Sequence, residues 1–227
     1  MREIVLDTET TGFYHNNGDK IVEIGAVELV NHLPTGKVFH KYINPEREIP
    51  EAAYKVHGLN YKFLRDKPTF IEIAESFLEF ISDDKLVIHN AKFDIGFLNM
   101  ELLYAKKSQI NYNQVIDTLL LAREKFPGSP ASLDALCRRF AIDNSKRKLH
   151  GALLDSEILA DVYLELIGGR QPNLGLTKTD KKEKSGQENL NLEKLIRVRN
   201  LKNRLTREER EAHENFLKKI NTKQNWS

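Results

Sequence analysis

The sequence predicts an α/β fold in which a mixed β-sheet is flanked by helices. Residues 2–9 (REIVLDTE) form a short apolar run typical of a buried strand. Residues 20–30 alternate apolar and polar side chains, and residues 37–45 predict a third strand after a turn at residues 34–36. Three strands with short connections indicate an antiparallel meander, and the strand and helix periods that follow place helices against the sheet.

The elements after the meander are predicted from their periodicity. The run KLVIHN predicts a strand over 85–90. Ser132 or Ser129 is the expected N-cap of the third helix. Apolar residues at helical spacing predict helices over 70–81, 91–105, 129–142 and 151–167.

The C-terminal part has a different composition. Residues 170–191 are polar, rich in lysine and interrupted by Gly and Pro, which indicates a flexible linker. Residues 192–220 predict two short amphipathic helices, the second started by a capping box of Thr206 and Glu209. Such helices cannot bury a core alone. We therefore expect a domain over 1–169, a linker over 170–191 and a partner-binding helical segment over 192–227.

The composition excludes several classes of protein. The 227 residues are 40% hydrophobic and 30% charged, as in ordinary globular proteins. No apolar run approaches the roughly 20 residues of a membrane helix, and the N-terminus lacks the apolar stretch of a signal peptide. The single Cys137 fits a reducing compartment. We expect a cytoplasmic protein that does not contact a membrane.

The charge is divided unevenly along the chain. Residues 168–227 hold 15 Lys and Arg against 8 Asp and Glu, whereas residues 1–167 hold 20 against 25. An acidic enzyme that acts on a polyanion must offset its own carboxylates, and bound divalent metals are the usual means. The basic tail is either a contact for nucleic acid or an acidic partner, or a solvated charge run.

Two carboxylates follow the first buried strand directly. Asp7 and Glu9 point to one face of the strand, about 6.5–7 Å apart, because side chains alternate along a strand. Two acids so close repel each other unless a cation lies between them. Two exposed acids at a strand end are the structural alternative.

Two more carboxylates fall on the packing faces of predicted helices. Asp94 shares a face with Phe97 and Leu98, where a carboxylate is costly unless compensated; stabilisation of the helix N-terminus is the alternative. Asp155 shares a stripe with Leu159 and Val162. His150 is expected in the loop before that helix, where it is a natural general base.

Together the four carboxylates have the makeup of a site for two hard divalent cations, Mg²⁺ or Mn²⁺. Two such ions about 4 Å apart stabilise the attacking and leaving oxygens in a displacement at phosphorus. Phosphodiester hydrolysis is therefore the predicted reaction.

The segments DTETTG, HNAKFDIGFLN and HGALLDSEILADVY, in this order, resemble the three motifs of the DEDDh exonucleases of the RNase H-like superfamily. Residues 1–169 are most similar to the epsilon proofreading subunits of bacterial DNA polymerase III. The resemblance implies an RNase H-like sheet and 3′-5′ hydrolysis of a DNA end to 5′-monophosphates. It assigns metal binding to Asp7, Glu9, Asp94 and Asp155, and general-base activity to His150.

The resemblance also implies residues around the substrate. It places Thr8, His57, Asn90 and Phe93 at the terminal nucleotide, together with Asp7, Glu9 and Asp155. Ala52 stands where many relatives are expected to carry an acid that helps hold the nucleotide, although Glu51 is adjacent.

The tail resembles the partner-binding part of the same family. Gln171, Leu174 and Leu176 resemble its motif for the β sliding clamp, and QENLNL from Gln187 repeats the spacing. Residues 192–227 resemble the segment that binds the polymerase α subunit. A small theta-like subunit is a further partner to consider.

Three alternatives share parts of this pattern, and one of them, a metallophosphatase that acts on small substrates, is suggested only by the shared metals. A free-standing DEDDh nuclease acting on RNA or short oligonucleotides would have the same catalytic residues but no need for the tail. A non-catalytic tether between clamp and polymerase would use the tail and leave the inward-facing acids unexplained.

Overall fold

The computed structural model describes residues 1–145, 147, 149–168 and 206–220. The chain divides into two units, residues 1–176 and 177–227. Each is described by itself. Among the described residues, no helix is both long and apolar enough to cross a membrane.

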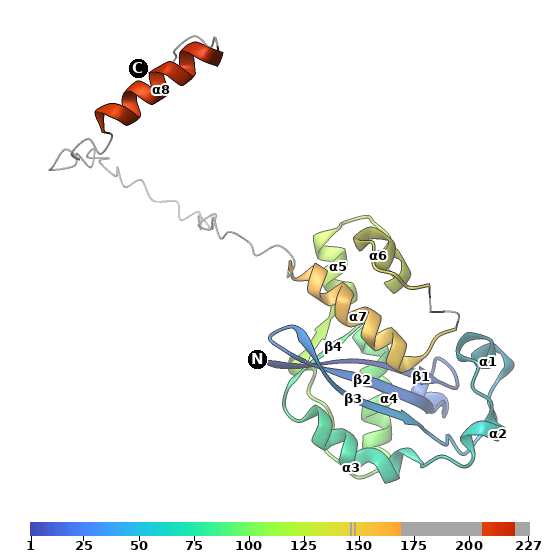
Figure 1. The fold of residues 1–227 in the computed structure, drawn as a ribbon. Coiled ribbons are helices and arrows are strands. Elements are labelled where there is room, and N and C mark those ends of the chain that lie inside the picture. Colours follow the sequence, from blue (N-terminus) through green and yellow to red (C-terminus); the bar gives the residue numbers. More distant parts are fainter. Residues whose placement is uncertain (146, 148, 169–205, 221–227) are drawn as a thin grey trace, which may run out of the picture. The chain divides into compact units, whose positions relative to one another are not determined.

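A five-stranded mixed sheet forms the centre of the first unit (Figure 1). Its strand order is β3-β2-β1-β4-β5, and β1 pairs antiparallel with β2 but parallel with β4. This arrangement confirms the predicted mixed sheet. The strands are β1 Arg2–Thr10, β2 Ile21–Val30, β3 Leu33–Tyr42, β4 Lys85–Ile88 and β5 Val115–Asp117.

The hairpin between β2 and β3 turns earlier than predicted. The expected turn at residues 34–36 is wrong, because Val30 already pairs with Leu33. Asn31 and His32 make the turn, with φ of 51° and 67°. Two successive residues in the left-handed region form the tight hairpin turn that matches the twist of the strands. Asn tolerates this conformation better than most residues.

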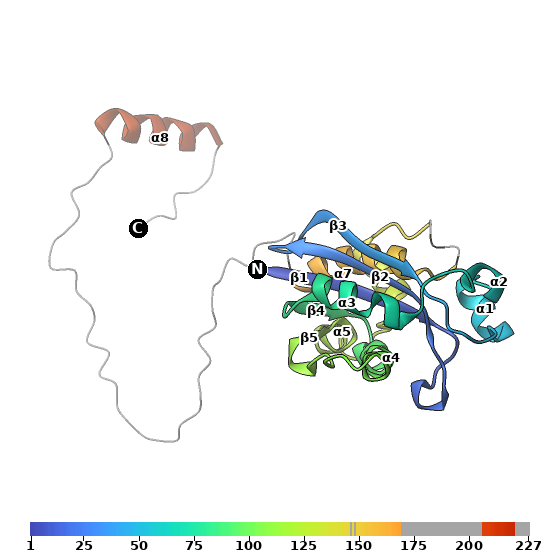
Figure 2. The same ribbon diagram turned by 90° about the horizontal axis from the view of Figure 1, so that it is seen from below.

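Alternating side chains of β1 build two cores, one on each face of the sheet. Ile4 and Leu6 pack against α3 Phe70–Ile81 and α4 Ala91–Tyr104. Val5 packs on the other face, in a core that includes residues of α5 Thr118–Lys125, α6 Leu133–Phe140 and α7 Ala152–Leu166. Figure 2 shows α3 in front of the sheet and α7 behind it.

The strongly periodic helices form where the sequence predicts them. The helix predicted over 70–81 is α3, and a capping box of Thr69 and Glu72 stabilises its N-terminus. The helix predicted over 129–142 is shorter and spans 133–140, because Ser132 rather than Ser129 caps it: Ser132 Oγ accepts a hydrogen bond from Ala135 N at 3.3 Å. Cys137 is fully buried in this helix.

Several short elements were absent from the sequence-based prediction. β5 has three residues, and α5 begins directly after it, capped by Asp117. Such short segments show no clear period. The others are α1 Glu51–His57, α2 Tyr61–Leu64 and the 3₁₀ turns η1 His15–Asn17 and η2 Tyr112–Gln114.

The start of α7 lies directly on β2 at Gly25. A methyl group at Gly25 would come within 2.2 Å of the backbone of Ala152 and Leu153. Ser156 Oγ lies 2.8 Å from the carbonyl oxygens of both Gly25 and Ala152. The missing side chain of Gly25 therefore lets the first turn of α7 approach the sheet.

The second unit contains α8 Arg207–Ile220. Thr206 and Glu209 form the predicted capping box, with Thr206 N donating to Glu209 Oε2 at 2.8 Å and Glu209 N to Thr206 Oγ1 at 3.2 Å. The predicted linker 170–191, the helix predicted after Leu192 and the clamp motif of Gln171, Leu174 and Leu176 lie outside the described residues.

Candidate active site

The C-terminal end of β1 carries the first two predicted site residues. Glu9 is buried and Asp7 is half-buried, on the face of the sheet that α7 covers. Asp7 pairs with Gly25 of β2 in the strand register. The alternative of two exposed acids at a strand end is therefore wrong.

Helix α4 brings Asp94 to the same end of β1. Asp94 is 3% exposed, and its Oδ1 accepts hydrogen bonds from Thr8 Oγ1 at 2.7 Å and from Thr8 N at 3.1 Å. Asn90 occupies the predicted N-cap position of α4 but adopts a left-handed conformation, and its side chain makes no capping hydrogen bond. Its backbone N–H donates to Asp117 instead.

Helix α7 and the loop before it supply the remaining pair. Asp155 lies in the first turn of α7 and is 2% exposed, on the predicted stripe with Leu159 and Val162. His150 lies in the loop as predicted, and its backbone N–H donates to Val56 O of α1 at 3.1 Å. Its Nδ1 is 3.3 Å from Asp155 Oδ2.

These segments meet around a cavity of about 770 Å³. A neighbouring cavity of about 440 Å³ is lined by His57 and shares Thr8, Glu9 and Phe93 with the first. The structure thus brings together all the predicted site residues that it describes, and their roles remain predictions. The first cavity is lined by Asp7, Thr8, Glu9, Asn90, Phe93, Asp94, His150 and Asp155 among others.

Three of the carboxylates resist ionisation. Burial, together with the charges of Asp94 and Glu9, raises the pKa of Asp7 well above its usual range. Burial and the charge of Asp155 raise the pKa of Glu9 to about 8. Burial also raises the pKa of Asp94 to about 7, even though hydrogen bonds from Thr8 act in the opposite direction. A cation placed among these groups would stabilise their ionised forms.

Asp155 behaves differently because it has partners. Burial opposes its charge, but its close contacts with His150 and Arg147 outweigh that effect and lower its pKa. The Arg147 guanidinium donates to both carboxylate oxygens of Asp155, at 2.6 and 2.8 Å, and to Asp134 Oδ1 at 2.7 Å.

The donor set fits a divalent cation. Glu9, His150 and Asp155 can each offer a ligand atom, and these atoms lie within 4.8 Å of one another. Carboxylate oxygens are the ligands that Mg²⁺ and Mn²⁺ prefer. Asp7 and Asp94, which line the same cavity, add further oxygen ligands.

His57 lies in the neighbouring cavity in a defined protonation state. Its Nδ1 accepts a hydrogen bond from Leu59 N at 3.0 Å, so the ring proton lies on Nε2. Burial lowers the pKa of His57 and keeps it neutral. Nε2 is buried, and its contact with the Thr10 backbone falls outside hydrogen-bond geometry. Glu51 pairs with Lys55 at 2.7 Å and does not line this cavity, so it does not replace the acid expected at Ala52.

Sequence analysis missed several residues that line the larger cavity. Arg147, Asp134 and His89 each contribute to its wall. A cation three residues before the predicted base His150 was the available signal for Arg147, whereas Asp134 and His89 carry no local signal.

The family model described as Exonuclease matches residues 4–163 of the chain. A protein of Rickettsia typhi named DNA polymerase III subunit epsilon is 50% identical over an alignment of 227 positions, which covers 97% of each chain. The chain belongs to the exonuclease family, and within it to the epsilon subunits of DNA polymerase III. The Escherichia coli K12 protein of the same name is 53% identical over 176 residues, or 74% of this chain and 72% of the relative.

Solved structures place this exonuclease in the same fold group. Exonuclease X in complex with 5′ overhanging duplex DNA matches with a TM-score of 0.59 and 26% identity, over 74% of this chain and 92% of the other. The nuclease domain of 3′hExo, a DEDDh family member bound to rAMP, matches with a TM-score of 0.64 over the same shares of the two chains. At 17% identity, this TM-score shows that the two chains share a fold. The predicted RNase H-like fold and DEDDh resemblance are confirmed.

Proposed function

We propose that this chain is a metal-dependent 3′-5′ exonuclease that proofreads DNA synthesis as the epsilon subunit of DNA polymerase III. The observation that carries the proposal is the group of carboxylates from β1, α4 and α7 that line one cavity, an arrangement that a bound cation would stabilise. The relatives named epsilon subunit supply the biological setting.

Asp7, Glu9, Asp94 and Asp155 would hold two divalent ions, which we propose are Mg²⁺ or Mn²⁺. When bound, such ions lower the pKa of water and stabilise the charge that develops at phosphorus. Thr8 holds Asp94 through two hydrogen bonds to one oxygen, so the other oxygen is free to face the cavity.

His150 takes a proton from the attacking water in this proposal. Its side chain is 48% exposed at the cavity mouth, and its backbone is fixed to α1 by the bond to Val56. Exposure lets the ring exchange protons with solvent after each turnover, while the backbone contact keeps it beside Asp155.

The terminal nucleotide is proposed to occupy the smaller cavity. Thr8, Glu9 and Phe93 line both cavities, so a nucleotide bound in the smaller one would present its phosphate to the carboxylates. The Nε2–H of His57 is available to donate a hydrogen bond to the sugar or phosphate. Asn90 borders the larger cavity from the start of α4.

Selectivity for mispaired ends follows from access. A paired end must lose base pairing and stacking at a cost of a few kcal/mol before it reaches the cavity, and a mismatch has already lost part of that energy. The enzyme therefore needs no side chain that distinguishes one base from another.

The partners and domain boundaries complete the proposal. We infer that 1–169 is the nuclease domain, that Gln171, Leu174 and Leu176 bind the sliding clamp, and that 192–227 binds the polymerase α subunit. α8 supports the last assignment, since it is amphipathic and its Phe216 is 58% exposed. A theta-like subunit is a third candidate partner, and the site of action is the cytoplasm.

The test is degradation of a 3′-mismatched primer–template by the purified full chain in Mg²⁺, with and without the polymerase α subunit of the same replication system. Stepwise release of 5′-monophosphates, faster for the mismatch and stimulated by the polymerase, is expected. Turnover without stimulation would indicate a free-standing nuclease, and no turnover in Mg²⁺ or Mn²⁺ would contradict the enzymatic proposal.

A further inference from the structure

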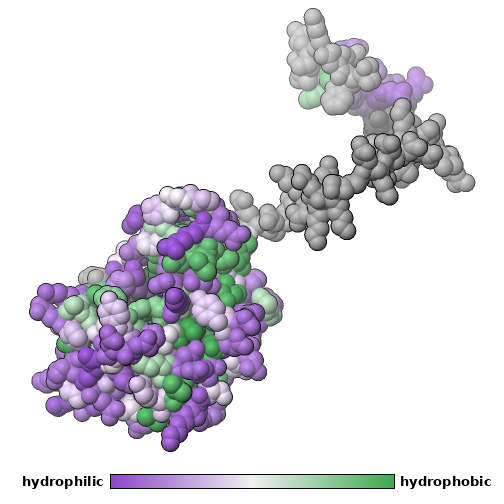
Figure 3. Space-filling model, turned by 180° about the vertical axis from the view of Figure 1, so that it is seen from behind, coloured by the Kyte–Doolittle hydropathy of each residue, from purple (hydrophilic) through white to green (hydrophobic). Residues whose placement is uncertain are grey.

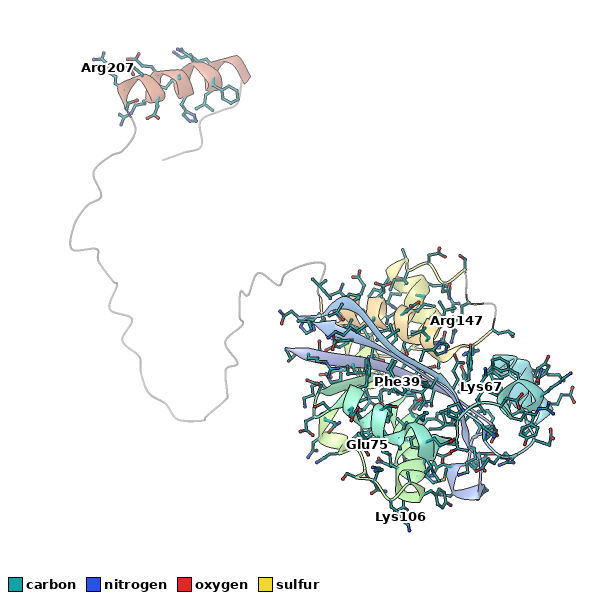
Figure 4. All side chains as sticks on the ribbon, turned by 60° about the horizontal axis from the view of Figure 1, so that its bottom comes forward. Phe39, Lys67, Glu75, Lys106, Arg147 and Arg207 are labelled. Carbon is teal, nitrogen blue, oxygen red and sulfur yellow. The ribbon has the colours of Figure 1, made fainter. Side chains whose placement is uncertain are left out.

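Arg147 is a cation already built into the carboxylate cluster. Its side chain is 9% exposed and lies in the loop between α6 and α7. Figure 4 shows it beside the yellow ribbons of these two helices. It lines the same cavity as the proposed metal ligands, so it belongs to the site without being part of the family resemblance drawn from the motifs.

The guanidinium is held by three groups at once. Nε and one terminal nitrogen donate to the two oxygens of Asp155, at 2.6 and 2.8 Å. The other terminal nitrogen donates to Asp134 Oδ1 at 2.7 Å. A further contact of 2.8 Å joins the guanidinium to His150 Nδ1, which must accept because arginine has only donors.

This geometry occupies the groups that a metal ion would use. Both Asp155 oxygens already accept a charge-assisted hydrogen bond, and His150 Nδ1 spends its lone pair on the same guanidinium. Asp155 and His150 are two of the three residues whose ligand atoms lie within 4.8 Å of one another. A divalent ion placed there would share these atoms with a fixed positive charge.

We propose that Arg147 is a resident competitor of the divalent cation at Asp155, and that it sets the metal concentration at which this site fills. The inference rests on the proposed metal role of Asp155. Metal entry requires the guanidinium to release at least one Asp155 oxygen. Arginine cannot lose its proton under these conditions, so it can only move away.

Asp134 makes such a movement feasible. It lies in the first turn of α6 and is 47% exposed, so it can retain the guanidinium when Asp155 turns to the metal. Asn144 also donates to Asp134 Oδ1 at 3.0 Å and links the same loop to α6. The loop can thus stay attached to α6 in both arrangements.

The test measures metal affinity rather than turnover. Mn²⁺ is titrated into the full-length chain, and free Mn²⁺ is followed by electron paramagnetic resonance. Arg147→Met removes the competitor with little change in volume, and we expect the dissociation constant for Mn²⁺ to fall by about tenfold or more, because like charges in a shared site repel strongly. Arg147→Lys keeps the charge but loses the two parallel donors of the guanidinium, so its affinity for Mn²⁺ should lie between those of Arg147→Met and the wild type.

Arg123→Met is the matched control. Arg123 lines the same cavity from α5, and its removal deletes one positive charge that forms no ion pair with Asp155 among the described residues. We expect a change of less than about twofold, since charges separated through solvent are screened. Circular dichroism would confirm that each variant is folded, and Arg147→Gln would replace Arg147→Met if the latter did not fold.

The outcomes separate this inference from the proposed function. Unchanged or weaker Mn²⁺ binding in both neutral Arg147 variants would overturn the competitor role while leaving the metal site intact. Equal tightening in the Arg147 and Arg123 variants would reduce the effect to general charge and would also overturn it. Failure of the wild-type chain to bind Mn²⁺ would overturn the metal site itself.

Discussion

Strand β1 carries carboxylates at both ends, and the two ends treat them in opposite ways. At one end Glu3 is fully buried, yet Tyr163 Oη and His32 Nδ1 each contact one of its oxygens at 2.7 Å. At the other end Asp7 and Glu9 face one another's charge, and the positive charge of Arg147 offsets only part of the resulting rise in their pKa values.

The pKa values express the same contrast. Hydrogen bonds from Arg2 and Thr35 lower the pKa of Glu28 to about 2, whereas burial raises that of Glu9 to about 8. The end with Glu3 and Glu28, whose carboxylates have hydrogen-bond partners, is the paired end, and it contributes to stability. The end with Asp7 and Glu9 is the unpaired end. It is costly to the fold, which is typical of sites selected for chemistry rather than for stability.

The largest expected effect comes from the unpaired end. Asp7→Asn keeps the size of the side chain but removes a charged oxygen ligand, and we expect exonuclease rate to fall by about 10⁴-fold or more, as when one member of a concerted site is lost. Mononucleotide release from a 3′-mismatched primer in Mg²⁺ measures it. Glu28→Gln, at the paired end, is the control and should retain most activity; near-normal turnover of Asp7→Asn would remove Asp7 from the metal site.

The next effect concerns His150. His150→Ala should lower the rate by about 10²–10⁴-fold if the ring is the general base. The deficit should shrink as pH rises, because hydroxide replaces the base. A rate profile from pH 6 to 9 for both proteins measures this, and a deficit that stayed constant across the range would assign His150 to positioning.

The expected effect on stability is smaller, and substitution of Glu9 should stabilise the fold rather than weaken it. A raised carboxylate pKa means that the folded protein binds the proton more tightly than the unfolded chain, so the cost grows as pH rises from about 4.5 to about 8. In EDTA at pH 8.5, Glu9→Gln should therefore raise the free energy of unfolding, by roughly 1–2 kcal/mol. Urea denaturation measures it. No gain at pH 8.5, or an equal gain at pH 4, would contradict the strain assigned to Glu9.

The paired end should show the reverse. The lowered pKa of Glu28 stabilises the fold above pH 4.5, and this contribution is lost as pH falls toward 2. Glu28→Gln should cost about 1 kcal/mol at pH 7, in the range of a single ion pair. Urea denaturation between pH 7 and 3 checks whether the difference fades; a pH-independent cost would indicate lost packing instead.

The sequence was most informative where the period of apolar residues was strong. α3, α4 and α7 were predicted because their buried stripes are long, and Asp94 and Asp155 stood out as acids on those stripes. The surface carries little such signal: Figure 3 shows it mainly hydrophilic, with scattered hydrophobic areas.

Side-chain contacts between different elements could not be predicted. The pairing of Arg147 with Asp134 and Asp155 joins a loop to two helices, and no local pattern encodes it. The hairpin turn was misplaced because Pro34 and Gly36 are strong turn formers, whereas register is fixed by cross-strand pairs such as Val30 and Leu33.

Gly25 joins the two halves of the site at one backbone position. It pairs with Asp7 in the sheet and lies against the turn of α7 that precedes Asp155. The spacing between strand-borne and helix-borne carboxylates is thus set by the absence of a single methyl group. For a proofreading enzyme, a change at Gly25 would therefore raise the mutation rate, because the chain could still assemble with its partners while copying errors accumulate uncorrected.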